Sequence, residues 1–350
     1  MIRDLHTELI EINRAQISPA VLERAGAILR AGGLVAFPTE TVYGLGADGL
    51  NEEAARKIYA AKGRPSDNPL IVHIADTEAL NKIVQEVPKA AEKLAEAFWP
   101  GPLTMIFHKN ECVPLGTTGG LSTVAVRMPS DEIARELIRQ GGGYIAAPSA
   151  NVSGRPSPTT AQHVYEDLNG RIPLILDGGP VPIGLESTIV DLTEECPVIL
   201  RPGYITRSMI REVIGEVQVD QGLIEENALV RPKAPGMKYR HYAPKAELLI
   251  VEGPMDQVIA YINGQCCDSG KTGVICTEET KTCYPGKVVK CIGSRKDERS
   301  IASHLFQVLR EFDEEEVDRI YSESFHTPGL GQAIMNRLLK AAGHRKIYVT

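Results

Sequence analysis

The sequence contains few aromatic residues, no long apolar run and no paired cysteine motif. Aromatic residues make up 5% of the 350 positions, and no stretch approaches the roughly 18–20 apolar residues of a membrane span. The first residues carry Asp4, Glu8 and Glu11 where a secretory signal would need apolar side chains. We therefore expect a soluble, cytoplasmic protein that makes no membrane contact.

The cysteines and the charges exclude further classes of protein. The seven cysteines are odd in number and form no CxxC, which argues against a disulfide scaffold and a zinc site, although five of them fall between 266 and 291. Acidic residues outnumber basic ones, 45 to 38. A net charge of −7 argues against a general nucleic-acid coat, but it leaves room for a local basic cleft.

The usual nucleotide and hydrolase motifs are also missing. There is no GxxxxGK[ST], no GxGxxG that opens a helix after a strand, and no GxSxG, HExxH or EF-hand loop. If the protein handles a phosphate compound, it must do so with side chains and short loops.

Apolar runs separated by turn signals predict an α/β fold. Strands are expected at 34–38, 69–75, 103–107, 122–129, 144–148, 173–177, 187–192 and 197–202. The last two strands are too close together for a parallel crossover, which needs a dozen or more residues, so they should form an antiparallel hairpin. The first sheet is therefore predicted to be mixed. Residues 39–46 are expected to form a turn.

The chain is long enough for two domains with cores of their own. We predict a first domain over 1–210, a basic linker with proline and tyrosine over 211–245, and a smaller domain over 246–350. In the last of these, strands alternate with helices, and this alternation predicts a small Rossmann-like α/β domain with a parallel sheet.

The densest candidate site is the turn KGRPSDNP at 62–69. Lys62 ends a predicted helix, and two prolines stiffen the chain after Arg64, so that both cations and Asn68 can meet one anion. His73 follows four residues later. The alternative is that Lys62 and Arg64 only complement the helix dipole. In either case we expect both side chains to leave the helix end toward solvent.

Polar residues also follow the predicted strand ends. Ser149 and Asn151 stand after the strand 144–148, where α/β folds bind ligands, or they serve turn geometry alone. Arg127 interrupts an apolar strand, so it is either exposed at an edge or paired with a buried anion. Five further positions are weak by themselves: Thr39, Thr41, Ser187, Thr188 and Arg201.

Residues 231–245 carry five lysines or arginines, no acid, and the aromatic residues Tyr239, His241 and Tyr242. Such a segment could clamp a nucleotide by stacking and charge, or it could be a solvated tether between domains.

Together these segments resemble a known family. GLVAFPTETVYGLG, KGRPSDNPL, APSANVSG, GLESTIVD and ILRPG follow in the order and spacing of the Sua5/YrdC family of L-threonylcarbamoyladenylate synthases. APGMKYRHYAP followed by an α/β domain resembles the longer, Sua5-type branch. The resemblance implies a YrdC-like twisted mixed sheet with flanking helices, followed by a smaller C-terminal domain.

The resemblance also implies an activity. Family members condense L-threonine, bicarbonate and ATP to threonylcarbamoyl-AMP and diphosphate. The product passes to a threonylcarbamoyl transferase that acts on tRNA, where it forms N6-threonylcarbamoyladenosine. We expect Mg²⁺ to arrive with ATP and expect no dedicated protein cage for it. The basic linker also leaves room for direct contact with tRNA or other double-stranded RNA.

The same resemblance assigns roles to residues. Lys62 and Arg64 would be catalytic. Threonine would be framed by Thr39, His73, Arg127, Ala147 and Ser187. ATP would contact Arg64, Asn68, Thr123, Ser149, Asn151, Arg201 and Tyr242, the last closing over the nucleotide as part of a lid.

Two other functions remain open at this point. The first is an RNA-binding module of the same fold without chemistry, which the basic linker suggests and the net negative charge opposes. The second is a carbamoyl-adenylate enzyme of hydrogenase maturation, although the CxxC zinc repeats of those chains do not occur here.

Overall fold

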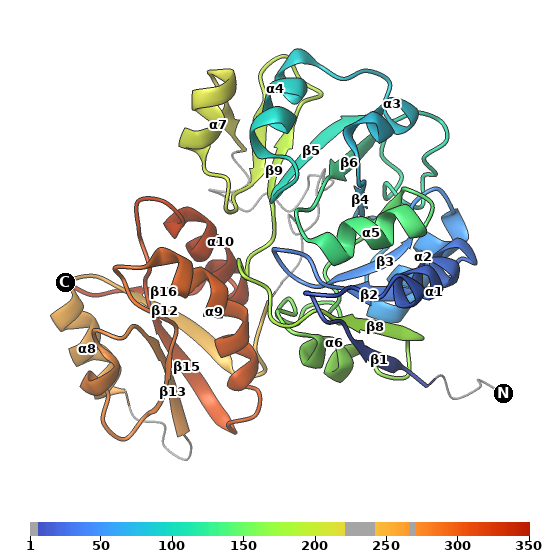
Figure 1. Ribbon diagram of the computed structural model, residues 1–350. Coiled ribbons are helices and arrows are strands. Elements are labelled where there is room, and N and C mark those ends of the chain that lie inside the picture. The colour runs from blue at the N-terminus through green and yellow to red at the C-terminus, as the bar shows by residue number, and fades with distance from the viewer. Residues whose placement is uncertain (1–5, 221–241, 266–270) are drawn as a thin grey trace. The chain divides into compact units, whose positions relative to one another are not determined.

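The protein consists of two compact units, and each is described here by itself. A computed structural model describes residues 6–220, 242–265 and 271–350. Among these, the larger unit contains 6–153, 158–182 and 186–220, and the smaller unit contains the remainder. Figure 1 labels the helices and strands of both units.

The larger unit is built on a twisted mixed sheet. Its strands are β1 (Glu8–Glu11), β2 (Val35–Phe37), β3 (Gly44–Asp48), β4 (Ile71–His73), β5 (Leu103–His108), β6 (Thr123–Arg127), β7 (Ile145–Ala147), β8 (Leu174–Asp177), β9 (Thr188–Asp191), β10 (Val198–Arg201) and β11 (Gln218–Val219). Their order across the sheet is β1-β8-β2-β3-β7-β4-β6-β5-β9-β10-β11. As predicted from the short connection, β9 and β10 pair antiparallel, and the sheet as a whole is mixed.

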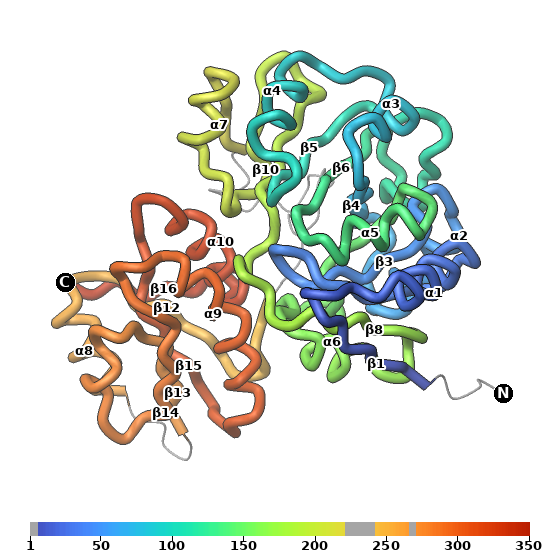
Figure 2. The backbone as a smooth tube through the Cα atoms, viewed as in Figure 1, coloured from blue at the N-terminus to red at the C-terminus, as the bar shows by residue number. Residues whose placement is uncertain are grey.

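Helices flank this sheet. They are α1 (Pro19–Arg30), α2 (Glu52–Lys62), the 3₁₀ helix η1 (Thr77–Ala79), α3 (Leu80–Ile83), α4 (Lys89–Phe98), α5 (Glu132–Gln140), α6 (Ala161–Leu168) and α7 (Arg207–Ile214). Figures 1 and 2 show α1 and α5 side by side, and their leucines and isoleucines share a core cluster with β2, β7 and β8. Residues of α2 and α6 pack with other side chains of β2, β3 and β7.

One part of the sheet carries an apolar cluster made of strand residues alone. Its buried members are Ile71, Ile106, Ala125, Ile189 and Leu200. They lie on β4, β5, β6, β9 and β10. In the cross-strand register, Ile71 stands opposite Ala125 and Ala125 opposite Ile106, so these side chains share one face of the sheet. This face carries the polar residues described below.

The prediction of a turn over 39–46 is wrong at its end, because β3 already begins at Gly44. The glycines hid this strand from the sequence pattern. A Cβ on Gly46 would lie 2.8 Å from the Ile145 side chain and 2.9 Å from that of Phe37. Gly46 is therefore a strand residue whose missing side chain lets neighbouring strands fill the space.

Ordered structure continues past residue 210. Helix α7 runs to Ile214, and β11 pairs in parallel with β10. Residues 221–241 of the expected linker lie outside the described residues, as do Cys266 and Cys267. No helix within the described ranges is long and apolar enough to cross a membrane.

The smaller unit has a parallel sheet, as predicted. Its elements are β12 (Glu247–Glu252), α8 (Met255–Gly264), β13 (Lys271–Cys276), the 3₁₀ helix η3 (Lys281–Cys283), β14 (Val288–Cys291), α9 (Glu298–Glu311), β15 (Val317–Glu323), α10 (Gly331–Ala341) and β16 (Lys346–Tyr348). The strand order is β14-β13-β15-β12-β16, and every pairing is parallel. Side chains of α8 pack with Val251, Val274 and Tyr321 on one face.

The cysteines of this sheet are thiols. Cys276, Cys283 and Cys291 are free, and Cys276 stands opposite Cys291 in the register of β13 and β14. Burial raises the pKa of the Cys276 thiol to about 12, so it stays protonated and behaves as a small apolar core residue.

Candidate active site

The last turn of α2 positions Lys62. Asn51 caps the start of this helix by accepting hydrogen bonds from the backbone of Glu53 and Ala54, and Gly63 ends it with φ +61°. Contrary to the expectation of a solvent-facing side chain, Lys62 is 1% exposed. Its ammonium group donates to the carbonyl oxygens of Ser149 and Asn151. The helix end and the loop after β7 are thereby joined through one buried cation.

That loop and the turn after α2 form the first part of the candidate site. The Ser149 hydroxyl lies 2.5 Å from Asn151 Oδ1. Arg64 folds back on its own turn and donates to the carbonyl oxygens of Asn68 and Pro69, at 3.3 and 3.1 Å. The side-chain oxygen of Asn68 is buried and accepts no hydrogen bond from the described residues, so it can receive a donor from a ligand.

Arg127 is the centre of the second part. It is 4% exposed, and its guanidinium lies 2.7 Å from Glu40 Oε1 and donates to the Thr41 hydroxyl at 2.9 Å. The sequence left open whether Arg127 is exposed at an edge or paired with a buried anion. The structure shows the second arrangement. The Thr41 hydroxyl in turn lies 2.9 Å from that of Thr39.

His73 lies next to Arg127 in the register of β4 and β6. Its ring Nδ1 lies 3.1 Å from the Ile71 carbonyl oxygen. Burial, together with the charge of Arg127, lowers the pKa of His73 from 6.5 to about 3. The imidazole is therefore neutral at physiological pH, and it offers hydrogen bonds instead of charge.

Ser187 and Arg201 continue the second part across the sheet. The Ser187 hydroxyl lies 2.7 Å from that of Thr104. Arg201 donates to the Ser187 carbonyl at 3.0 Å and to its hydroxyl at 3.1 Å. Because Arg201 stands opposite Ile189 at the end of the β9–β10 hairpin, its guanidinium lies on the face of the apolar cluster.

Several of the predicted residues thus lie in two groups along β4, β6 and β7. Thr123 stands at the start of β6 and Arg127 at its end, so four steps of about 3.3 Å place their Cα atoms roughly 13 Å apart. Asn68 and Ser149, assigned to ATP, lie toward the Thr123 end, whereas His73 lies at the Arg127 end. Ala147 is buried between them, opposite Ile71. Arg201, also assigned to ATP, lies with Ser187 of the threonine group.

Tyr242 belongs to the smaller unit. It is 5% exposed and has φ +62°, and its ring packs against that of Phe306 in α9, 5.0 Å between centroids. The next backbone N–H, of Ala243, donates to the Gly154 carbonyl at 3.0 Å. The structure shows this tyrosine as a packed aromatic residue, and its contact with ATP stays a prediction.

Two residues of the site escaped the sequence analysis. Glu40 lies between two threonines that were noted as candidates, and Thr104 lies at the start of an apolar strand. Neither position departs from the pattern of an ordinary turn or strand. Only the pairing of Glu40 with Arg127 and of Thr104 with Ser187 reveals them.

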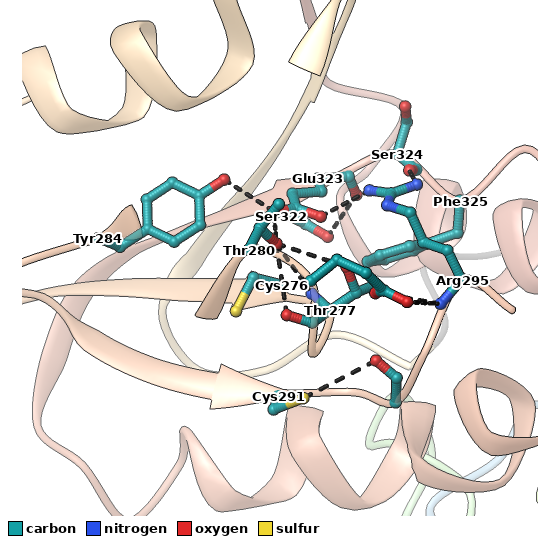
Figure 3. Close-up of polar contacts among 12 residues, drawn as sticks. Cys276, Thr277, Thr280, Tyr284, Cys291, Arg295, Ser322, Glu323, Ser324 and Phe325 are labelled. Atoms are coloured by element: carbon teal, nitrogen blue, oxygen red, sulfur yellow. Dashed lines mark hydrogen bonds and ion pairs between the residues drawn. The ribbon is translucent and has the colours of Figure 1, made fainter. Parts of the chain in front are cut away.

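A second polar cluster lies in the smaller unit, at the carboxyl ends of β13 and β15 (Figure 3). The buried carboxylate of Glu323 accepts hydrogen bonds from Thr280 and from Tyr284, the latter at 2.8 Å, and pairs with Arg295 at 2.5 Å. Three donors leave this carboxylate little capacity for a ligand, so the cluster serves to hold the loops together. Within the described ranges, no group of three or more His, Cys, Asp or Glu could hold a metal ion.

Both units match family models. The model described as "Telomere recombination", of the Sua5/YciO/YrdC type, matches residues 27–203, and "Threonylcarbamoyl-AMP synthase, C-terminal domain" matches 205–343. Among curated proteins, the threonylcarbamoyl-AMP synthase of Bacillus subtilis is 49% identical over 97% of both chains. That of Pyrococcus abyssi is 50% identical over 96% of this chain and 98% of its own.

A solved structure agrees with these relatives. The crystal structure of P. abyssi Sua5 complexed with L-threonine has a TM-score of 0.91 at 47% identity, over 98% of this chain and 100% of that one. The fold and the polar face define a two-unit α/β enzyme with cations and hydroxyls along one side of a mixed sheet. The chain belongs to the Sua5/YrdC family of threonylcarbamoyl-AMP synthases.

Proposed function

We propose that this enzyme condenses L-threonine, bicarbonate and ATP to threonylcarbamoyl-AMP, with release of diphosphate and water. The proposal is carried by one observation: Lys62, Arg127 and Arg201 are buried cations, and the two arginines donate to side-chain hydroxyls. Three substrates that each carry a negative group need such a set of cations. The relatives named threonylcarbamoyl-AMP synthase, and the relative crystallised with L-threonine, support the same conclusion.

The chemistry explains why the site needs no nucleophilic side chain. The amine of threonine attacks carbon dioxide or bicarbonate, and an oxygen of the resulting carbamate attacks the α-phosphorus of ATP. Both nucleophiles belong to substrates. The protein has to bring anions together and to stabilise diphosphate as it leaves.

The two groups of residues suggest how the substrates divide the face. Threonine fits the end of β6 that carries the Arg127 guanidinium and lies near the hydroxyls of Thr41 and Ser187. The phosphates fit toward Lys62 and Arg64, and Asn68, Thr123, Ser149 and Asn151 would contact the nucleotide. The separation of roughly 13 Å along β6 suits an elongated acyl-adenylate. Mg²⁺ would be carried largely by the phosphates.

The product would pass to a threonylcarbamoyl transferase that modifies tRNA, which places the reaction in the cytoplasm. The test is incorporation of labelled bicarbonate into an adenylate with threonine, ATP and Mg²⁺, measured with and without a transferase and tRNA. Threonine-dependent labelling is expected. RNA binding that weakens steeply with salt, with no adenylate formed, would instead support an RNA-binding module.

A further inference from the structure

Glu40 is a buried carboxylate whose hydrogen-bonding capacity is unused. Its side chain is 8% exposed. Oε1 lies 2.7 Å from Arg127 Nη2, yet within the described residues neither oxygen accepts a hydrogen bond of ordinary geometry, and Arg127 Nη2 donates none. Burying a carboxylate that accepts no hydrogen bond costs folding free energy, and native proteins rarely contain such a group. The arrangement calls for an explanation.

Nearby groups do not supply the missing donors. Asp131 is the neighbouring carboxylate, and it is already bonded to Arg14 at 2.8 Å and to the backbone N–H of Ala134 at 3.0 Å. The hydroxyl of Thr41 accepts from Arg127, and Thr39 bonds the Val42 carbonyl at 2.7 Å. Glu40 therefore keeps open acceptor sites next to the guanidinium that faces the proposed threonine position.

A zwitterion matches this pair of side chains. A guanidinium prefers a carboxylate, and a carboxylate with free lone pairs prefers a compact cation with several N–H donors. An ammonium group on the carbon next to the carboxylate presents both charges within a few ångströms. A divalent metal ion fits less well, because the guanidinium of Arg127 already lies 2.7 Å from Glu40 Oε1 and would repel a second cation there.

We propose that Glu40 binds the ammonium group of the amino-acid substrate, and that this contact selects an amino acid over the corresponding 2-hydroxy acid. Arg127 takes the carboxylate of the same molecule. The proposal rests on the proposed function, in that threonine is the substrate. It adds Glu40 as a specificity-determining residue, which acts before any bond is made or broken.

The test compares threonine with 2,3-dihydroxybutanoate, which carries a hydroxyl in place of the ammonium group. Calorimetry on the full chain should show that the wild type binds threonine at least about tenfold more tightly, since a charge-assisted hydrogen bond is lost with the analogue. Glu40→Gln, of the same shape, should bring the two affinities within about threefold of each other. Equal affinities in the wild type would overturn the proposal without any variant.

The controls separate this role from others. Glu136→Gln is the same change in an exposed pair with Arg139 on α5, and it should leave the ratio of affinities unchanged. Glu40→Asp retains the charge and should retain the preference for threonine, so it decides the matter if Glu40→Gln does not fold. If Glu40→Gln keeps the wild-type ratio of the two affinities, Glu40 only positions Arg127 and the proposal is wrong. It is also wrong if the change alters only the Mg²⁺ requirement, because Glu40 then acts on the metal. A wild type that binds threonine selectively but makes no adenylate would count against the proposed function alone.

Discussion

At the scale of single residues, this protein uses a few buried charges, and each of them holds a backbone or side-chain partner. Lys62 bonds two carbonyl oxygens of the loop that carries Asn151. Arg127 bonds Thr41 and pairs with Glu40. Such groups are positioned before any substrate arrives, so the site does not have to reorganise when negative charge develops.

Lys62→Ala and Arg64→Ala should both slow the synthesis of the adenylate. We expect a loss of about 2–4 kcal/mol in the transition state, or roughly 30- to 1000-fold in rate. They should differ in stability. Lys62→Ala leaves two carbonyls without their donor and should cost about 1–3 kcal/mol. Half-buried Arg64 donates to carbonyl oxygens of its own turn, and Arg64→Ala should cost less. Rate assays with urea unfolding check both, and near-normal synthesis by both variants would contradict the site assignment.

His73 should make the larger unit sensitive to acid. Its pKa is lowered to about 3 by burial and by Arg127, so the unfolded chain binds a proton that the folded chain refuses between pH 6.5 and 3. Stability should therefore fall as the pH drops below 6.5, by at most about 1.4 kcal/mol per pH unit from this group. The single tryptophan, Trp99, reports unfolding of this unit. A His73→Gln variant should show a shallower decline between pH 7 and 4, and an equal decline would mean that other groups cause it.

At the scale of secondary-structure elements, loops at strand ends are held by side chains that come from different elements. Helix α2 reaches the loop after β7 through Lys62. In the smaller unit, the residues on either side of η3, the loop before α9 and the end of β15 meet at Glu323 (Figure 3). Each such contact replaces water on a backbone or carboxylate group that the strand end would otherwise leave unsatisfied.

Arg295→Met tests this view of the Glu323 cluster. The change leaves a fully buried carboxylate with two neutral donors and no cation, and it should destabilise the smaller unit by about 1–3 kcal/mol. Arg319→Met removes a cation from an exposed pair with Glu247 and should cost under about 1 kcal/mol. Urea unfolding by circular dichroism, with Trp99 fluorescence to mark the larger unit, measures both. Equal effects of the two changes would contradict a special role for the buried pair.

At the scale of the whole molecule, the two units have separate cores, but they are not separate in sequence. The short segments 154–157 and 183–185 belong to the smaller unit. There, Arg310 of α9 donates to the Pro156 carbonyl at 2.6 Å, and Arg155 lies 3.4 Å from Asp313. In the sequence, the segment 154–157 begins three residues after Asn151 of the site loop.

A chain that ends at residue 220 should therefore fold and yet function poorly. All core clusters of the larger unit lie within it, and the cut spares β11, which a shorter chain ending near 215 would lose. We expect weaker ATP binding or faster loss of the adenylate, because the proposed lid around Tyr242 and the anchor for 154–157 are gone. Nucleotide titration and product lifetime measure this.

Tyr242→Phe in the full chain is the matched control for this truncation, since the ring against Phe306 remains. Its product lifetime should stay close to that of the wild type if packing, and not the hydroxyl, keeps the segment in place. A truncated chain with unchanged nucleotide affinity and product lifetime would reduce the linker and the smaller unit to spacers.

The sequence by itself determined the mixed larger sheet, the parallel smaller sheet and the family. These follow from local signals: apolar periods, the short gap between β9 and β10, and glycine, proline and cation motifs at strand and helix ends. The candidates Lys62, Arg127, Ser149 and Asn151 were found in the same way. Strands β1, β3 and β16 were not predicted from the sequence. Their glycines, short length or edge position leave them without a recognisable apolar pattern.

Only the tertiary structure decided which charges are buried and what they meet. Lys62 was expected to face solvent, but a loop about ninety residues away covers it. Glu40 and Thr104 became part of the site because β2, β5, β6 and β9 bring Arg127 and Ser187 to them. Burial and long-range pairing depend on how strands are ordered across a sheet. That order is set by the packing of the whole core, and the residue type at a single position does not reveal it.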